Sequence, residues 1–266
     1  MPKFIILNMV QLPPSIQPLL INGGIIEPTE KNVLRLIIPS HSKKYCDAQI
    51  DDYHHLPRKN FLWSPPCRMQ IRARASHPQP LGTLGFGFWN DPFTISIGQG
   101  GAARRLPAAP KTIWFFYGSR ENDIRLNPSL PGNGWKATSI NSLNIPSLLL
   151  APVAVGAITC SYIPLIRPLI MDTARRFVTV EETMLESSLD QWHTYTIDWT
   201  TEKAVFYVDE KEVLEVKEHY SGPLGFVAWI DNQFAVASPD NHFHFGVVPT
   251  VETQWLELDI RYLERM

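Results

Sequence analysis

The sequence predicts an all-β protein built as one two-sheet sandwich. Short stretches in which apolar and polar residues alternate recur along the chain, and clusters of Gly, Pro, Asn and Asp separate them, a pattern typical of β-sandwiches. The 266 residues fit one sandwich, because all-β domains commonly reach this size as single units. We therefore expect a single domain over 1–266 with little helix.

The expected strands follow one another along the chain. Residues 1–35 are rich in Pro and Gly, which favours extended edge segments and turns. The stretches 33–38 and 45–53 alternate well enough to be strands. The remaining strand signals lie at 68–75, 82–89, 111–118, 192–199, 204–209, 224–231, 242–248 and 254–263.

Five of these stretches resemble, in order, strands of family-16 glycoside hydrolases. The clearest is WHTYTIDW at 192–199, which leads through a polar turn into AVFYVD at 204–209. RMQIRARA at 68–75, GTLGFGFW at 82–89 and WLELDIRY at 255–262 complete the set. The resemblance implies a concanavalin-like jelly roll with one concave, ligand-binding face.

The strand that should carry the family's catalytic acids lacks them. The resemblance implies a Glu-x-Asp-x-x-Glu motif, and its three acidic positions fall on Thr112, Trp114 and Tyr117. A retaining glycosidase needs two carboxyl groups about 5–5.5 Å apart, and none of these side chains carries one. Glu121 and Asp123 follow as a displaced pair, but their setting is more simply that of a turn.

Aromatic side chains crowd the strands that would line the ligand face. Aromatic rings hold stacked sugars as well as flat apolar ligands. Because side chains alternate along a strand, about half of these rings must instead face the core. The expected ligand-binding residues are Phe88, Trp89, Asn90, Thr112, Trp114, Trp229 and Asn232.

Two similar strand ends supply polar groups. WNDP at 89–92 and WIDN at 229–232 each place Asp and Asn after a Trp, and we expect these polar ends to project onto one rim. A carboxyl group buried beside aromatics has a raised pKa and serves as an acid or a base, whereas hydrogen bonding within turns is the alternative role. The candidate proton donors are Tyr117, Asp91, Asp231 and His244.

The sequence predicts no cofactor. HFHF at 242–245 places His242 and His244 on one face of a strand, where they would begin a metal site, but no third ligand is evident. The three cysteines form no C-x-x-C pair, which argues against a disulfide framework or a structural zinc. We expect reduced thiols, no metal and no other cofactor.

An uncharged segment interrupts the strand pattern. No charged residue lies between Lys136 and Arg167, and the apolar run approaches the roughly 20 residues that cross a bilayer. Pro152, Gly156 and Pro164 interrupt this run. We expect an apolar, helical insertion at about 143–186 that packs on the sheet, covers the ligand face as a lid, or touches a membrane surface through 147–177.

Composition narrows the partners and the compartment. Lys and Arg total 24 against 26 for Asp and Glu, a net charge of −2 that gives no electrostatic footprint for nucleic acid. The N-terminal stretch lacks the features of a signal peptide. We therefore expect a cytoplasmic protein that does not bind nucleic acid.

Three functions fit these observations. The first is a non-hydrolytic protein of the glycosidase fold that binds a bulky, largely apolar small molecule and promotes its cyclisation or isomerisation by orientation and acid–base assistance. The second is a carbohydrate-binding protein with an oligosaccharide partner. The third is a glycoside hydrolase with relocated carboxylates, either Glu121 with Asp123 or Asp91 with Asp231.

Overall fold

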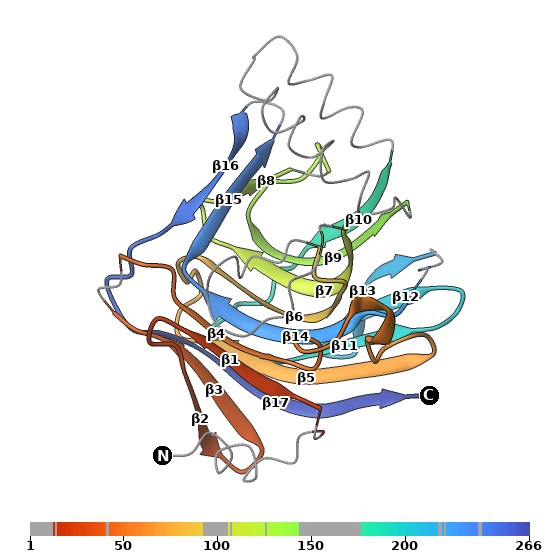
Figure 1. The fold of residues 1–266 in the computed structure, drawn as a ribbon, viewed down its shortest axis with the longest axis horizontal. Coiled ribbons are helices and arrows are strands. Elements are labelled where there is room, and N and C mark those ends of the chain that lie inside the picture. Colours follow the sequence, from red (N-terminus) through yellow and green to blue (C-terminus); the bar gives the residue numbers. More distant parts are fainter. Residues whose placement is uncertain are drawn as a thin grey trace.

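The protein folds as two large β-sheets packed face to face, with a small third sheet at one side (Figure 1). The computed structural model describes residues 13, 15–40, 43–92, 106, 108–125, 127–143, 177–217, 220, 222–238 and 241–266, without the side chains of 241–243. Its one short helix in this part is the 3₁₀ turn η1 (Arg58–Asn60). The predicted all-β, two-sheet sandwich is confirmed.

The first sheet has seven strands, and each pairs antiparallel with its neighbours. Its order runs β1 (Gln17–Ile21), β4 (Asp47–Asp51), β14 (Gly225–Asp231), β6 (Thr83–Trp89), β7 (Lys111–Gly118), β9 (Gly134–Ser142) and β10 (Val178–Met184). β7, the strand that lacks the expected acids, lies inside this sheet.

The second sheet also has seven antiparallel strands. Its order runs β13 (Lys211–Val216), β12 (Ala204–Val208), β11 (His193–Trp199), β5 (Cys67–Ala75), β17 (Gln254–Arg265), β3 (Val33–Ile38) and β2 (Ile25–Glu30). The small sheet joins β16 (Asn241–Val247), β15 (Gln233–Ser238) and β8 (Asp123–Ile124). The proline-bearing β1 and β2 are edge strands, where a missing N–H costs no ladder bond.

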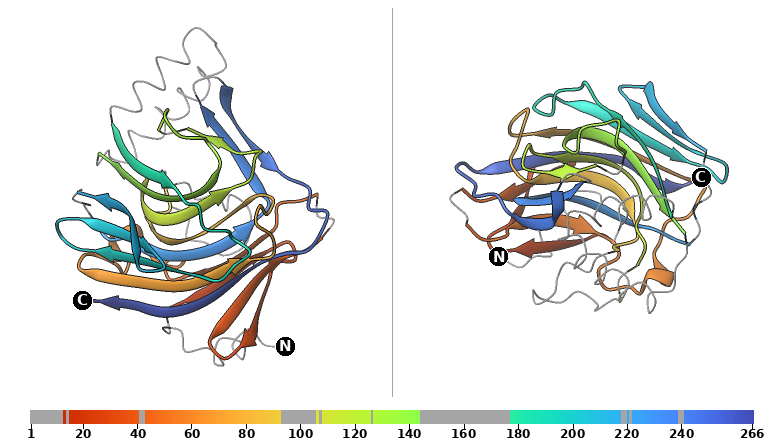
Figure 2. Two further views of the ribbon diagram at one scale, coloured as in Figure 1. Left: turned by 180° about the vertical axis from the view of Figure 1, so that it is seen from behind. Right: turned by 90° about the horizontal axis from the view of Figure 1, so that it is seen from above.

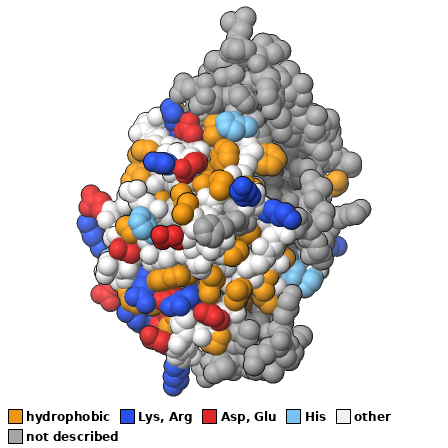
Figure 3. Space-filling model, turned by 90° about the vertical axis from the view of Figure 1, so that its left-hand side faces the viewer, with side chains coloured by type: hydrophobic (Ala, Val, Ile, Leu, Met, Phe, Trp, Pro, Cys, Tyr) orange, Lys and Arg blue, Asp and Glu red, His pale blue; other side chains and the backbone are white. Residues whose placement is uncertain are grey.

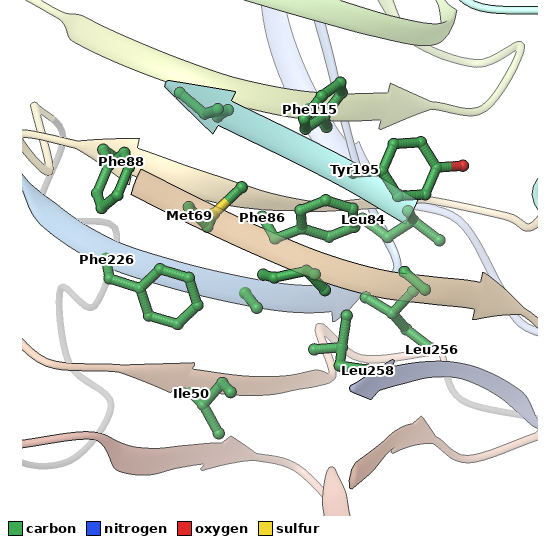
Figure 4. Close-up of a cluster of buried hydrophobic side chains, with 14 of the residues drawn as sticks. Ile50, Met69, Leu84, Phe86, Phe88, Phe115, Tyr195, Phe226, Leu256 and Leu258 are labelled. Atoms are coloured by element: carbon green, nitrogen blue, oxygen red, sulfur yellow. The ribbon is translucent and has the colours of Figure 1, made fainter. Parts of the chain in front are cut away.

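The core lies between the two large sheets. In β5 every second residue is buried, as expected for a strand with one core face. Phe86 and Phe115 of the first sheet meet Tyr195 of the second, with ring centroids 5.3 and 5.0 Å apart (Figure 4). Odd-numbered residues 113, 115 and 117 of β7 belong to this core, so its even-numbered residues face away from the second sheet.

The outer face of the first sheet lies on the inside of a curve. β9 and β10 rise at one side of the sheet, and β15 and β16 rise at the other (Figures 1 and 2). The surface seen in Figure 3 carries acidic and basic side chains side by side. The curvature and the strand order therefore place the outer face of β6, β7 and β14 between β9 and β10 on one side and β15 and β16 on the other.

The described end of the expected insertion is a strand, not a helix. Residues 178–184 form β10, which pairs with β9 and closes one edge of the first sheet. Val178, Val180 and Glu182 alternate with exposed residues in the two-residue period of a strand, which the apolar run before them obscured. Residues 144–176, which make up most of the expected insertion at about 143–186 and of the membrane-contact segment 147–177, lie outside the described residues.

The described residues include no helix long and apolar enough to cross a membrane. Cys46 and Cys67 are buried and form no disulfide, while Cys160 lies outside the described part of the chain. Strands β9, β13 and β15 carry weaker signals in the sequence and are found only in the structure.

Candidate functional site

Four aromatic rings cover the middle of the first sheet's outer face, and we call them the aromatic face. They are Trp89 of β6, Trp114 and Phe116 of β7, and Trp229 of β14. The Trp114 ring centroid lies 5.6 Å from those of Trp89 and Phe116, at interplanar angles of 30° and 21°, and 5.1 Å from that of Trp229. The rings therefore form one continuous surface across three strands.

Glycines in β6 make room for these rings. A Cβ added to Gly85 would lie 2.4 Å from the carbonyl oxygen of Phe115 and 2.8 Å from the Trp229 ring. At Gly87, where φ is +150°, it would lie 2.5 Å from Cβ of Trp114. Because β6 presents only hydrogen atoms here, side chains from β7 and β14 close over it.

A turn after β4 extends the apolar surface. The Tyr53 ring lies 6.0 Å from that of Trp89 and packs over Gly225, where a Cβ would be 2.4 Å from the Tyr53 ring. Asp51 fixes this turn: its Oδ1 accepts hydrogen bonds from the backbone N–H groups of Tyr53 and His54, and lies 2.7 Å from His54 Nδ1. Asp51 thus has a structural role.

Polar atoms without partners surround the rings. Among the described residues no hydrogen-bond partner exists for Trp89 Nε1, Thr112 Oγ1, Thr138 Oγ1 or Glu182 Oε1, all of them buried atoms. The register places Thr112 opposite Trp89, and Thr138 opposite both Trp114 and Glu182. Each unsatisfied buried group costs about 1–3 kcal/mol, and these four atoms belong to β6, β7, β9 and β10, the strands that carry the rings or lie beside them.

Glu182 is held by a buried lysine. Lys136 Nζ lies 3.2 Å from Glu182 Oε2 and also donates to the carbonyl oxygen of Pro131, and both charged side chains are only 4% exposed. Burial raises the pKa of Glu182, while Lys136 and a hydrogen bond from the Asn127 backbone oppose this shift. The second carboxylate oxygen, Oε1, is buried and has no hydrogen-bond partner among the described residues.

A pair of buried acids lies at one end of the outer face. Asp47 and Asp231 are directly opposite in the register of β4 and β14, which places their Cβ atoms about 4.5–5.5 Å apart. Burial, then repulsion from Asp231 and Asp51, raises the pKa of Asp47. Burial raises the pKa of Asp231 to about 7, against hydrogen bonds from Gln233 and Thr83.

The aromatic face contains part of the predicted site. Trp89, Thr112, Trp114 and Trp229 come together as expected, and Asp231 borders them through Thr83, whose hydroxyl donates to Asp231 Oδ1 at 2.8 Å and accepts from Trp229 Nε1 at 3.0 Å. The expected set lacked Phe116, Thr138, Lys136 and Glu182. Phe116 lies two residues after Trp114 and therefore on the same face of the strand, so this spacing could have identified it from the sequence.

Tyr117 does not reach this face. β7 pairs with β6 and β9 without a bulge, so the third motif position falls on the core side, two residues along from Phe115. Burial raises the pKa of Tyr117 to about 12. The geometry therefore places Tyr117 in the core, and Thr112, Trp114 and Phe116 occupy the outer positions of the strand.

Four other predicted residues have positions away from the rings. Phe88 is fully buried in the core beside Trp199. The Asn90 side chain donates to the Ala109 carbonyl and accepts from the Lys111 N–H. Asn232 ties Cys46, Lys44 and Val248 together, and His244 of β16 packs edge-on against Phe234 at 5.9 Å.

The two polar strand ends do not share a rim. β6 and β14 are antiparallel, with Trp89 opposite Gly225 and Asp231 opposite Thr83, so the ends lie about 20 Å apart at 3.4 Å per residue. The expected single rim is wrong because neighbouring antiparallel strands end at opposite edges. Asp91, whose carbonyl accepts a hydrogen bond from Arg58, is consequently too far from Asp231 to form an acid pair with it.

The displaced acids belong to a turn and to the small sheet. Glu121 lies in the turn after β7 and accepts a hydrogen bond from Arg120 at 3.1 Å. Asp123 belongs to β8 and pairs with Arg125 at 2.7 Å. Both carboxylates are thus engaged with arginines.

Comparisons with known proteins agree with this fold. No curated protein matches the chain. The family model "Glycosyl hydrolases family 16" matches residues 174–230, which include the WHTYTIDW strand. The kappa-carrageenase from Pseudoalteromonas carrageenovora, solved with an oligotetrasaccharide of kappa-carrageenan, has a TM-score of 0.51 at 11% identity, over 95% of this chain and 90% of that chain.

Two further solved structures have lower scores. A family-16 protein from the mixed linkage glucan locus of Bacteroides ovatus, in complex with G4G4G3G product, has a TM-score of 0.47 at 11% identity, over 89% of this chain and 83% of that chain. The endo-beta-1,4-glucuronan lyase from Trichoderma reesei has a TM-score of 0.47 at 11% identity, over 94% and 90%.

The fold defines the class: a concanavalin-like, two-sheet jelly roll. Within that class, the resemblance to family-16 glycoside hydrolases predicted from the sequence motifs is confirmed by the family match and the carrageenase fold.

Proposed function

We propose that the protein binds an oligosaccharide on the aromatic face and does not hydrolyse it with the acid pair of family 16. The observation that carries the proposal is the composition of this face: stacked rings with unpartnered hydroxyl, indole and carboxylate groups beside them. Rings stack on the apolar faces of sugars, while the polar groups bond their hydroxyls. The kappa-carrageenase of similar fold was solved with a bound oligosaccharide.

The outer positions of β7 argue against the family's retaining mechanism. Thr112, Trp114 and Phe116 occupy them, and none can attack an anomeric carbon as a carboxylate or protonate a glycosidic oxygen as a carboxylic acid. Glu182 is the acid nearest to these residues in the register, two strands from Trp114. One carboxylate and aromatic rings suit binding better than this two-acid hydrolysis.

The direct test of this proposal is the replacement of the central ring. Trp114→Ala removes the residue that contacts the other three rings, so we expect affinity for oligosaccharides to fall at least about tenfold. Isothermal titration with a panel of β-linked oligosaccharides measures it. The matched control is Trp192→Ala, on the outer face of the second sheet, where the ring packs against Arg72 and Arg74.

Unchanged affinity in folded Trp114→Ala, or an equal loss in Trp192→Ala, would contradict binding at the aromatic face. Circular dichroism and thermal unfolding establish that each variant is folded.

Hydrolysis by relocated acids is a second candidate, and one observation favours it. Asp47 and Asp231 are directly opposite in the register of β4 and β14, on the same face of the sheet. The hydrogen bonds that Asp231 accepts from the Thr83 hydroxyl and the Gln233 N–H favour a structural role instead. Product analysis by mass spectrometry separates the two: cleavage by the wild-type protein that Asp231→Asn abolishes would establish hydrolysis.

The apolar-ligand hypothesis has less support. A bulky apolar molecule that is cyclised or isomerised would use the rings, but it would leave Thr112, Thr138 and Glu182 unbonded. A hydroxyl-bearing ligand satisfies the rings and the polar atoms together.

A further inference from the structure

Two of the unpartnered polar atoms near the aromatic face, on Thr138 and Glu182, lie on its β9 and β10 side. Thr138 of β9 is directly opposite Trp114 on one side and Glu182 of β10 on the other. Neighbouring strands are about 4.8 Å apart, so Thr138 is one strand spacing from Trp114 and Glu182 is two. A sugar ring bound beside Trp114 would therefore have Thr138 and Glu182 on its β9 side.

The Glu182 carboxylate is prepared to accept a hydrogen bond. Lys136 neutralises its charge through Oε2, and the contact with the Pro131 carbonyl holds the lysine in place. Oε1 has no partner among the described residues and is buried. The carboxylate can thus accept a hydrogen bond from a ligand hydroxyl at Oε1, and the Thr138 hydroxyl beside it can donate or accept.

Within the part of the chain that the structure describes, the face offers no unpaired positive charge for an anionic ligand. Among the described side chains on the outer face of the first sheet, the acids are Asp47, Asp51, Asp231 and Glu182, and Lys136 is the sole base. That base is already engaged by Glu182. Among the described residues of this face, a sulfate or carboxylate group would find no free cation to pair with.

We propose that Glu182 and Thr138 bind hydroxyl groups of the sugar ring stacked on Trp114, and that this polar anchor selects a neutral glycan over one that carries carboxylate or sulfate groups. The inference rests on the proposed oligosaccharide binding and deepens it, because it names the specificity-determining residues and the class of ligand.

Three variants test the anchor. Thr138→Val keeps the shape but removes a hydroxyl that has no partner, so we expect affinity for neutral oligosaccharides to fall about fivefold without a lower melting temperature. Glu182→Gln weakens the acceptor, and we expect a loss of about tenfold or more. Glu181→Gln is the matched control, since Glu181 is exposed on the opposite side of β10.

The probes are neutral β-linked tetra- to hexasaccharides and matched oligosaccharides bearing uronate or sulfate groups, titrated calorimetrically. The proposal predicts that the wild-type protein prefers the neutral set and that Thr138→Val and Glu182→Gln weaken its binding while Glu181→Gln does not. Tighter binding of the charged set overturns it, and so does wild-type affinity in folded Thr138→Val.

The outcomes separate the two proposals. If Trp114→Ala abolishes binding but Thr138→Val and Glu182→Gln leave it unchanged, the anchor fails and oligosaccharide binding stands. If the wild-type protein binds no oligosaccharide of either set, both fail.

Discussion

Individual residues decide which chemistry the outer face can support. Thr112 and Trp114 stand where the family resemblance implies acids, and both face outward. Tyr117 has the right sequence spacing but the wrong side, because an unbulged strand turns alternate residues to opposite faces. The sequence shows that none of these three positions carries a carboxylic acid. It did not reveal Glu182, since that residue follows a long apolar run and its pairing with β9 depends on tertiary structure.

The buried Asp231 gives stability a dependence on pH. Its pKa is raised from 3.8 to about 7 in the folded protein, so this state binds the proton more tightly than the unfolded chain. Its stabilising contribution is full below about pH 4 and is lost as pH rises through 7, by up to about 4 kcal/mol. We expect Asp231→Asn to remove most of this decline in urea unfolding between pH 4.5 and 8.

Asp209→Asn is the control, because the pKa of Asp209 is shifted in the opposite direction from that of Asp231. Hydrogen bonds from the Thr194 N–H and from His193 lower the pKa of Asp209 although burial opposes them, so its contribution grows as pH rises from acid and is lost as pH falls. Parallel pH profiles for the wild-type protein and Asp231→Asn would contradict the raised pKa of Asp231.

At the scale of elements, period-two alternation predicted the strands that have one core face. β5, β7, β11 and β14 lie close to their predicted ranges for this reason. The pattern was less informative for edge and border strands such as β10, β13 and β15, which bury less of either face. It also could not give strand direction, and the single rim expected for Asp91 and Asp231 was wrong for that reason.

Gly85, in the middle of β6, leaves room for the Trp229 ring to pack over the strand. Gly85→Ala would place a methyl group against the Phe115 carbonyl oxygen and the Trp229 ring, so we expect about 1–3 kcal/mol of destabilisation, a lower melting temperature and altered tryptophan fluorescence. Gly118→Ala on β7 meets only the Asn122 side chain, at 3.0 Å, and should cost less. Equal melting temperatures for the two variants would contradict the close packing over β6.

At the scale of the whole molecule, the tryptophans fall into three groups according to the face or core position that the two large sheets give them. Trp89, Trp114 and Trp229 lie on the outer face of the first sheet, and Trp63, Trp135 and Trp199 belong to the core. Trp192 and Trp255 pack against arginines of the second sheet. The sequence motifs predicted the sandwich, but assigning each ring to a face required the register.

This division provides the most direct measurement of the central claim, that the outer face of the first sheet binds carbohydrate. In ¹⁵N-labelled protein, the indole N–H signals of all eight tryptophans are followed while a neutral β-linked oligosaccharide is added. We predict shifts for Trp89, Trp114 and Trp229, with the core and second-sheet indoles unmoved. Shifts confined to Trp192 and Trp255, or no shift at saturating oligosaccharide, would contradict the claim.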